Sequence, residues 1–213
     1  MRIISKGPEP RSLTMRRAAV AADDPRGYED YIGKDEVRAA LLAEQRGLCC
    51  YCMGRIANDA LKMKIEHWRC RDRYRDLQLD YGNLLGACLG GEGRPPNEQH
   101  CDTRKANLDI KWNPAHPAHA VESRLRYLVD GKVESTDPEF NTQLNDLLGL
   151  NLAYLKSNRK AVLDSVLTWW RSTPDARHKV QKQIEHRTEA AEYQPFSPVA
   201  VWFLRQKLGG AAP

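Results

Sequence analysis

The sequence predicts an α+β fold, in which a small metal-dependent module lies within a mainly helical chain that also contains a β-hairpin. All six cysteines fall between residues 48 and 113, together with the turn signals Gly90-Gly91 and Pro95-Pro96. Apolar residues recur at helical spacing on both sides of this module, and a strand-turn-strand pattern follows it. We therefore expect three parts: an N-terminal arm and helix (1–47), the cysteine-rich module (48–113), and a β-hairpin with a helical C-terminal region (114–213).

The N-terminal part begins with a segment of weak periodicity. Residues 1–30 are rich in Arg, Pro and Asp, so we expect an extended arm that becomes ordered only by docking onto the rest of the chain. Apolar positions at helical spacing then predict a helix from Lys34 to Arg46, and Gly47 is expected to end it in the left-handed conformation. This helix delivers the chain to the first cysteine.

The region after residue 113 is expected to hold the β-hairpin and several helices. Apolar and polar residues alternate up to Asp130-Gly131, which is a two-residue hairpin signal. A helical pattern then ends at Gly149, and another follows behind Asn151 as a possible N-cap. Pro174 separates this helix from the next, and a short closing helix is expected from Val199 to Leu208.

Charge and hydropathy restrict the class of protein. The chain has 33 Lys and Arg against 28 Asp and Glu, a modest excess that favours a polyanionic partner without deciding one. No stretch is apolar for the roughly eighteen residues of a membrane span, and the start lacks the apolar core of a signal peptide. We therefore expect a cytoplasmic protein without a membrane partner, whose cysteines are thiols or metal thiolates rather than disulfides.

The cysteines are spaced for a structural zinc site. Cys49 and Cys52 form a C-x-x-C pair, whose thiolates can occupy two corners of a zinc tetrahedron. Cys88 and Cys101 can close the site across a Gly- and Pro-rich loop, and His100 is the alternative to Cys101 as the fourth ligand. A redox pair is the competing interpretation of C-x-x-C. The two remaining cysteines are expected to be small buried apolar residues, namely Cys50 and Cys70.

Two candidate catalytic residues lie between the zinc half-sites. A strand over Lys62–Ile65 is expected to lead into Glu66-His67, and a bend after Glu66 would let both side chains face one site. Glu66 is then an oxygen ligand for a hard cation, and His67 is a base that is neutral near physiological pH. A metal ion and an imidazole together can activate water against a phosphodiester.

The combined pattern resembles the signature of the HNH endonucleases. The matching residues are Cys49-x-x-Cys52, Glu66-His67, Asn83-Leu84, Cys88 and Cys101-Asp102-x-x-Lys105.

The resemblance implies a zinc-stapled ββα-metal (HNH, His-Me finger) core over residues 48–113. In that core His67 is the general base, Asn83 braces the loop that bears it, and Glu66 with Asp102 holds a catalytic Mg²⁺ or Mn²⁺. The chain departs from the pattern at Asp102, where many members have His or Asn, and His100 is the competitor for that position. It also has a long insertion in place of the second C-x-x-C.

Longer segments within and beyond the core resemble the PtuB-type HNH nucleases of Septu and retron antiphage systems. They are LLAEQRGLCCYC, IEHWR, the HCD-x-x-K ending and the later LGLN segment that leads to Arg159. This resemblance implies a bacterial defence nuclease that cuts nucleic acid, DNA being favoured, together with an ABC/SMC-like ATPase partner of the PtuA type. The chain itself has no G-x-x-x-x-G-K-[ST] segment, so nucleotide hydrolysis would come from the partner. Arg159 is expected to brace the fold or an interface.

Basic residues around Glu66-His67 are candidates for phosphate contacts. We expect Lys64, Arg69 and Lys105 to bind the substrate, although interleaved aspartates make a solvated charged surface an equal alternative. Trp68 could stack on a base or pack in a small core. The rival to the enzyme is a non-catalytic zinc-dependent module that binds nucleic acid or protein, with His67 incidental.

Overall fold

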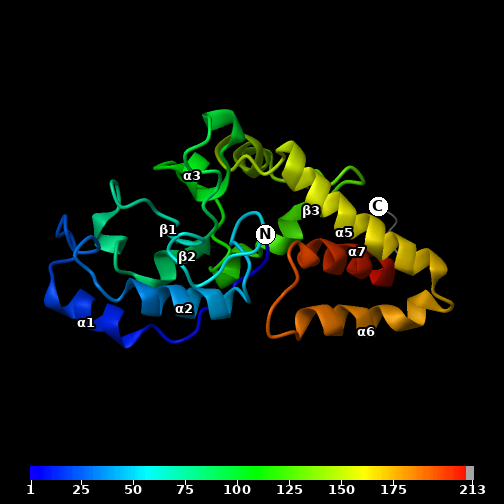
Figure 1. The fold of residues 1–213 in the computed structure, drawn as a ribbon, viewed down its shortest axis with the longest axis horizontal. Helices are drawn as coiled ribbons and strands as arrows, with labels where there is room; N and C mark the ends of the chain where they lie inside the picture. The colour runs from blue at the N-terminus through cyan, green and yellow to red at the C-terminus, as the bar shows by residue number, and fades with distance from the viewer. Residues whose placement is uncertain (210–213) are drawn as a thin grey trace.

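The computed structural model describes residues 1–209, and its elements form two groups along the long axis of the molecule (Figure 1). The first group contains α1 (Arg11–Ala19), α2 (Lys34–Glu44), β1 (Lys64–His67), β2 (Leu84–Ala87) and α3 (Cys101–Lys105). The second contains the three longest helices of the described residues, namely α5 (Ala153–Ser172), α6 (Ala176–Thr188) and α7 (Ser197–Gly209). Between them along the chain lie β3 (Leu125–Tyr127), β4 (Val133–Ser135) and α4 (Pro138–Thr142).

The N-terminal arm contains a helix that its sequence did not reveal. Of the nine residues of α1, only Leu13 is buried, so the helix has no apolar periodicity that could indicate it. The arm does dock as expected: Met1 and Ile4 are also buried, and the amide of Ile4 donates to the carbonyl of Pro114 at 2.9 Å. Long-range contacts therefore order a segment whose local pattern is weak.

The predicted helix before the cysteines is confirmed as α2. It buries Val37 and Leu41, and Gly47 follows in the left-handed region with φ +80°. Gln45, just past its end, is buried and donates to the carbonyls of Leu48 and Gly86, both at 2.7 Å. This amide ties the end of α2 to the cysteine segment and to β2.

Strands β1 and β2 pair antiparallel, with Lys64 opposite Ala87 and His67 opposite Leu84. Every residue of β2 is buried, so this short hairpin is held by packing rather than by strand length. The expectation that the strand ends before His67 was wrong, because β1 runs through His67. Neighbouring side chains on a strand alternate, so Glu66 and His67 point to opposite sides of β1.

The predicted second hairpin is confirmed as β3 and β4, joined through Asp130-Gly131. Gly131 has φ +83°, and a Cβ there would lie 2.0 Å from the carbonyl oxygen of Lys156, so only glycine fits this turn against α5. Arg159 is buried and donates to the carbonyls of Gly131 at 2.6 Å and Leu150 at 2.7 Å. Its expected role as a brace of the fold is confirmed.

The helical C-terminal region follows the predicted order, with one correction. Asn151 does not cap α5, whose N-cap is Leu152, because both polar atoms of its amide bind the main chain of Val133 in β4. Pro174 separates α5 from α6, and the closing helix is α7, as expected. Within residues 1–209, no helix combines the length and apolar composition that crossing a bilayer requires.

Candidate metal centre and catalytic group

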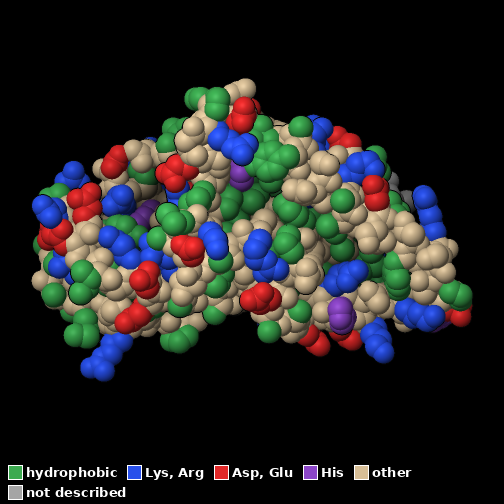
Figure 2. Space-filling model, viewed as in Figure 1, with side chains coloured by type: hydrophobic (Ala, Val, Ile, Leu, Met, Phe, Trp, Pro, Cys, Tyr) green, Lys and Arg blue, Asp and Glu red, His purple; other side chains and the backbone are tan. Residues whose placement is uncertain are grey.

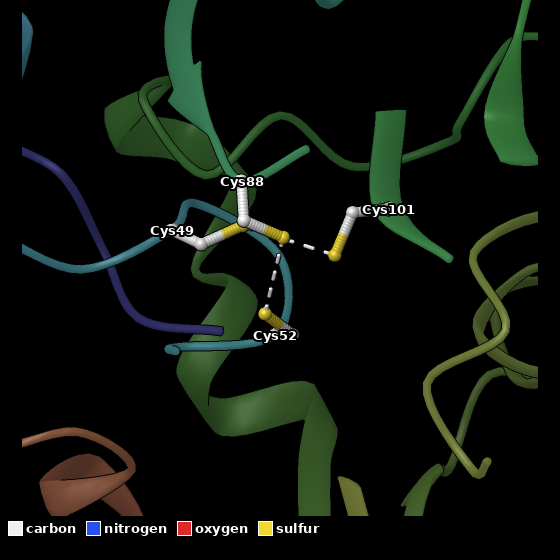
Figure 3. Close-up of side chains that lie close together, drawn as sticks. All are labelled: Cys49, Cys52, Cys88 and Cys101. Carbon is white, nitrogen blue, oxygen red and sulfur yellow. Dashed lines mark hydrogen bonds between the residues drawn. The ribbon is translucent and has the colours of Figure 1, made fainter. Parts of the chain in front are cut away.

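Four cysteines converge on one point, as Figure 3 shows. Their sulfur atoms all lie within 4.8 Å of one another, and the Cys49–Cys101 and Cys52–Cys88 sulfur pairs are each 3.8 Å apart. Sulfurs placed about 2.3 Å from a central zinc ion in a tetrahedron are separated by about 3.8 Å. The cluster therefore has the donor set and the dimensions to hold a zinc ion, and none of its members forms a disulfide.

Three separate segments deliver these cysteines. Cys49 and Cys52 lie in a tight knuckle, in which the amide of Gly54 donates to the Cys52 sulfur at 3.4 Å. Cys88 directly follows β2, and Cys101 begins α3. The Gly- and Pro-rich loop between them closes through the main chain, since the amide of residue 100 donates to the carbonyl of residue 90 at 2.9 Å.

The protonation of the cluster is suited to a metal. Burial alone would raise the pKa of Cys49, but hydrogen bonds from Cys101 and the neighbouring thiols hold that pKa well below its usual value. Contact with Cys101 lowers the pKa of Cys52 to about 7. The pKa values of Cys88 and Cys101 are raised instead, by the neighbouring thiols and, for Cys101, first by burial, so a zinc ion would have to displace the protons of these two sulfurs to bind all four as thiolates.

His100 flanks the cluster rather than completing it. Its Nδ1 lies 3.1 Å from the Cys101 sulfur and 3.9 Å from the Cys88 sulfur, and the four mutually close donor atoms are all sulfurs. The ring is buried against Tyr154. This placement suits a hydrogen bond from the imidazole to a thiolate, the usual role of a residue just outside a metal's own ligands.

Glu66 lies on the side of β1 that faces the cysteine knuckle and α3. It is 3% exposed, accepts a hydrogen bond from the Tyr51 hydroxyl at 2.8 Å, and has the Lys105 ammonium 2.7 Å away. Burial, followed by the nearby Asp102 carboxylate, raises the pKa of Glu66 well above its usual value, whereas Lys105 opposes the shift. Glu66 and Asp102 therefore form a close carboxyl pair with an internal cation.

His67 lies on the other side of β1. Its Nε2 is 3.0 Å from the carbonyl oxygen of Gln78, so Nε2 carries the proton and Nδ1 keeps a free lone pair. The ring of Tyr28 meets it edge-on at 4.5 Å, and the side chain is 6% exposed. Burial lowers the pKa of His67 to about 4, so the imidazole is neutral, as a base must be.

Asp102 acts electrostatically on the groups on both sides of β1. Its negative charge raises the pKa values of both Glu66 and His67, although burial remains the larger influence on each. Its side chain is 21% exposed, and Lys64 lies 3.6 Å from it. The two carboxyl groups thus lie together beside α3, and the neutral imidazole lies on the opposite side of β1 within the electrostatic influence of Asp102.

Asn83 bridges the backbone that follows His67. Its side-chain oxygen accepts from the amide of Arg69 at 2.7 Å, and its amide group donates to the carbonyls of Arg69 at 3.0 Å and Leu77 at 3.1 Å. Asn83 is buried, so these bonds are protected from water. The loop after β1 is consequently fixed to the segment that precedes β2.

The three residues expected to contact substrate are placed differently from one another. Lys64 and Arg69 are partly exposed, and each is paired with an acid, Arg69 with Asp109 at 3.1 Å. The expectation for Lys105 was wrong: its side chain is 1% exposed, and its ammonium binds Glu66 and the carbonyl of His67, at 3.1 Å, instead of reaching the surface.

An 82-residue segment of the chain is similar to the Septu protein PtuB of Bacillus thuringiensis. The two sequences are 29% identical there, over 38% of this chain and 28% of that protein. No protein-family model matches the chain. The similarity thus concerns a minor part of each sequence.

The residues that hold the catalytic candidates in place were not predicted from the sequence. Tyr51 lies inside the cysteine knuckle and binds Glu66, whereas Gln78 contacts His67 through a main-chain oxygen. The Gln78 side chain also holds the arm, because its oxygen accepts from the amide of Tyr28 at 3.0 Å. The position of Tyr51 between two predicted zinc ligands could have indicated its role, but nothing in the sequence marks the backbone oxygen of Gln78 as an acceptor.

Proposed function

We propose that this chain is a metal-dependent endonuclease of the HNH type, which hydrolyses phosphodiester bonds of nucleic acid, DNA being favoured. The observation that carries this proposal is the Glu66–Asp102 carboxyl pair on the β1–β2–α3 unit beside the four-cysteine cluster, with the neutral imidazole of His67 next along β1. Paired carboxyl groups can bind a hard divalent cation, and a neutral imidazole can take a proton from water, which are the two functions that metal-assisted hydrolysis requires.

Each residue has a defined part in the proposed reaction. The free Nδ1 of His67 accepts the proton of the attacking water. Asp102, the more exposed carboxylate, and Glu66 hold Mg²⁺ or Mn²⁺, which when bound neutralises charge on the phosphate. Lys105 and the Tyr51 hydroxyl both contact Oε1 of Glu66, at 2.7 Å and 2.8 Å, so Oε2 is the atom that Glu66 would offer to the ion. Asn83 positions the loop that follows the base.

The substrate would approach over the basic side chains near β1. Lys64 and Arg69 remain candidates for phosphate contacts, since both are partly exposed and Arg69 also stacks on Trp68, with 4.2 Å from guanidinium to ring centroid. Basic and acidic side chains alternate over the face seen in Figure 2, so the surface charge itself selects no strand direction or sequence.

We further propose that the chain acts in a Septu-like antiphage system with an ABC/SMC-like ATPase. The similarity to Septu protein PtuB supports this assignment. The lack of a phosphate-binding G-x-x-x-x-G-K-[ST] segment in the sequence agrees with an ATPase on a separate chain. Co-purification of a tagged chain with the products of its neighbouring genes tests the partnership, and recovery of the chain without an ATPase would contradict it.

One observation favours a non-catalytic zinc-dependent binding module instead: His67 is almost fully buried beneath Tyr28. Plasmid cleavage by the zinc-loaded chain, alone and with its co-purified partner, separates the two functions. We expect cleavage only with added Mg²⁺ or Mn²⁺, and its loss in Asp102→Asn. The matched control is Asp164→Asn, which removes a half-exposed carboxylate from α5. Cleavage without a divalent metal, or equal cleavage by both variants, would contradict the nuclease assignment.

A further inference from the structure

A cavity of about 390 Å³ lies between the first residues of the chain, the start of β3, and helices α6 and α7. Figure 1 shows the N-terminus beside the beginning of α7. None of the four clustered cysteines and none of the three candidate catalytic residues lines this cavity. Its volume falls within the range of small-molecule sites, roughly 300–1,000 Å³. The cavity therefore has room for a ligand that is separate from the proposed cleavage chemistry.

The charged residues that line the cavity leave it cationic. Arg2, Arg187 and Arg205 face a single acid, Glu122. Glu122 is engaged by Arg205 at 3.0 Å and by the amide of Ile3 at 3.0 Å, and Arg2 lies 3.9 Å from it. Three guanidinium groups and one carboxylate give a net charge of about +2, because arginine remains protonated in proteins.

Arg187 is the unpaired member of this set. Its Nε is buried and has no hydrogen-bond partner within residues 1–209. Burial lowers the pKa of Arg187, and no carboxylate within the described residues raises it in compensation. A guanidinium nitrogen that is shielded from water without a partner is unfavourable, and a bound anion relieves that cost.

The other side of the cavity is apolar and aromatic. Trp202 and Val201 of α7 line it together with Leu125 of β3. The Trp202 ring is held edge-on by Tyr127, with 5.5 Å between the ring centroids. A fixed indole is a surface on which a heterocyclic base stacks, and such stacking strengthens binding in nucleic-acid sites.

We propose that this cavity binds a nucleoside monophosphate, with the phosphate beside Arg187 and Arg205 and the base against Trp202. The charge of a phosphate monoester near neutral pH, about −1.5 to −2, balances the surplus of the lining. A bare phosphate would leave the apolar side unfilled, and a nucleoside would leave Arg187 unpaired. The chain would then bind a nucleotide at a place distinct from its proposed cleavage site.

Isothermal titration calorimetry of the zinc-loaded full chain with AMP tests this proposal. The affinity tag is placed at the C-terminus because Met1 lines the cavity, and no divalent metal other than zinc is added. We expect saturable binding with a Kd below about 1 mM. Adenosine and inorganic phosphate, the two halves of the ligand, should each bind at least about tenfold more weakly than AMP.

Matched variants locate the binding. Arg187→Gln should weaken AMP binding at least about tenfold, whereas Arg177→Gln removes an exposed charge from the same helix and should leave binding unchanged. If Arg187→Gln does not fold, Arg205→Gln carries the same expectation. Absence of AMP binding by the folded chain, phosphate that binds as tightly as AMP, or equal losses in the cavity variant and the control would each overturn the proposal.

Discussion

The Lys105→Met variant tests the buried ion pair beside the candidate catalytic group. Lys105 is fully buried, and its ammonium makes two short contacts, with Glu66 at 2.7 Å and with the carbonyl of His67 at 3.1 Å. Both are charge-assisted because the donor is an ammonium, and each such hydrogen bond contributes about 1.5–3 kcal/mol. Their sum agrees with the cost of about 3–5 kcal/mol for removing one member of a buried ion pair. We expect the variant to lose about this much unfolding free energy.

The loss should depend on pH in a defined direction. Burial and Asp102 already raise the pKa of Glu66, and removal of the Lys105 cation raises it further. A carboxyl group whose folded pKa is raised destabilises the folded state as pH rises through that pKa. Lys105→Met should therefore be closer to wild type at pH 5 than at pH 8, because Glu66 takes up a proton at the lower pH.

Urea denaturation of the zinc-loaded protein, followed by tryptophan fluorescence, measures these changes. Glu66→Gln in the Lys105→Met background removes the unpaired carboxylate and should restore more than half of the lost stability. The control Lys160→Met removes an exposed partner of Asp164 and should cost less than about 1 kcal/mol. A Lys105→Met variant within about 1 kcal/mol of wild type, or a double variant without recovery, would refute the ion-pair reasoning.

Three further predictions concern the metal centre, the candidate base and its loop. Cys88→Ser should lower bound zinc from one ion per chain and destabilise the fold, whereas His100→Ala should keep the zinc. Atomic absorption measures the bound zinc, and it would show the reverse if the imidazole were the fourth ligand. The pKa of His67 falls from 6.5 to about 4 on folding, so the unfolded chain binds protons more readily. The stability of the wild type should therefore fall by about 1.5 kcal/mol from pH 6.5 to pH 5 relative to His67→Gln. Parallel stability profiles of the two proteins would contradict the shift. Asn83→Ala leaves the amide of Arg69 without its acceptor and should lower the free energy of unfolding by about 1–3 kcal/mol. Hydrogen exchange at that amide should become faster, and unchanged exchange would contradict the bracing role.

The sequence was informative where chemistry depends on spacing along the chain. The knuckle of Cys49 and Cys52 fixes two ligands locally, and Cys88 follows a strand that must return to it. Spacing alone left Cys101 and His100 as alternative fourth ligands. The choice between them depends on main-chain hydrogen bonds of the loop from Gly90 to His100, which the sequence does not reveal. Residue types and intervals thus predicted the donor set, and the tertiary fold determined its geometry.

The sequence was misleading where long-range packing overrides residue type. A lysine is usually a surface residue, yet Lys105 is buried because Glu66 offers it a countercharge. The arm gave no helical pattern over α1, and no local signal placed Tyr28 against His67. The strand was predicted to end at Glu66, but it continues through His67. This difference of one residue places the two side chains on opposite sides of the strand instead of on one side.

Single-turnover cleavage of plasmid DNA by His67→Ala measures the central claim most directly. The assay uses zinc-loaded protein with its co-purified partner and Mg²⁺ or Mn²⁺, and the matched control is His186→Ala, which removes an exposed imidazole from α6. We expect His67→Ala to retain zinc and fold while its cleavage rate falls by at least about a hundredfold, the usual contribution of a general base. The control should cut like wild type. Wild-type cleavage by a folded, zinc-loaded His67→Ala would contradict the assignment of His67 as the base and the proposed HNH chemistry with it.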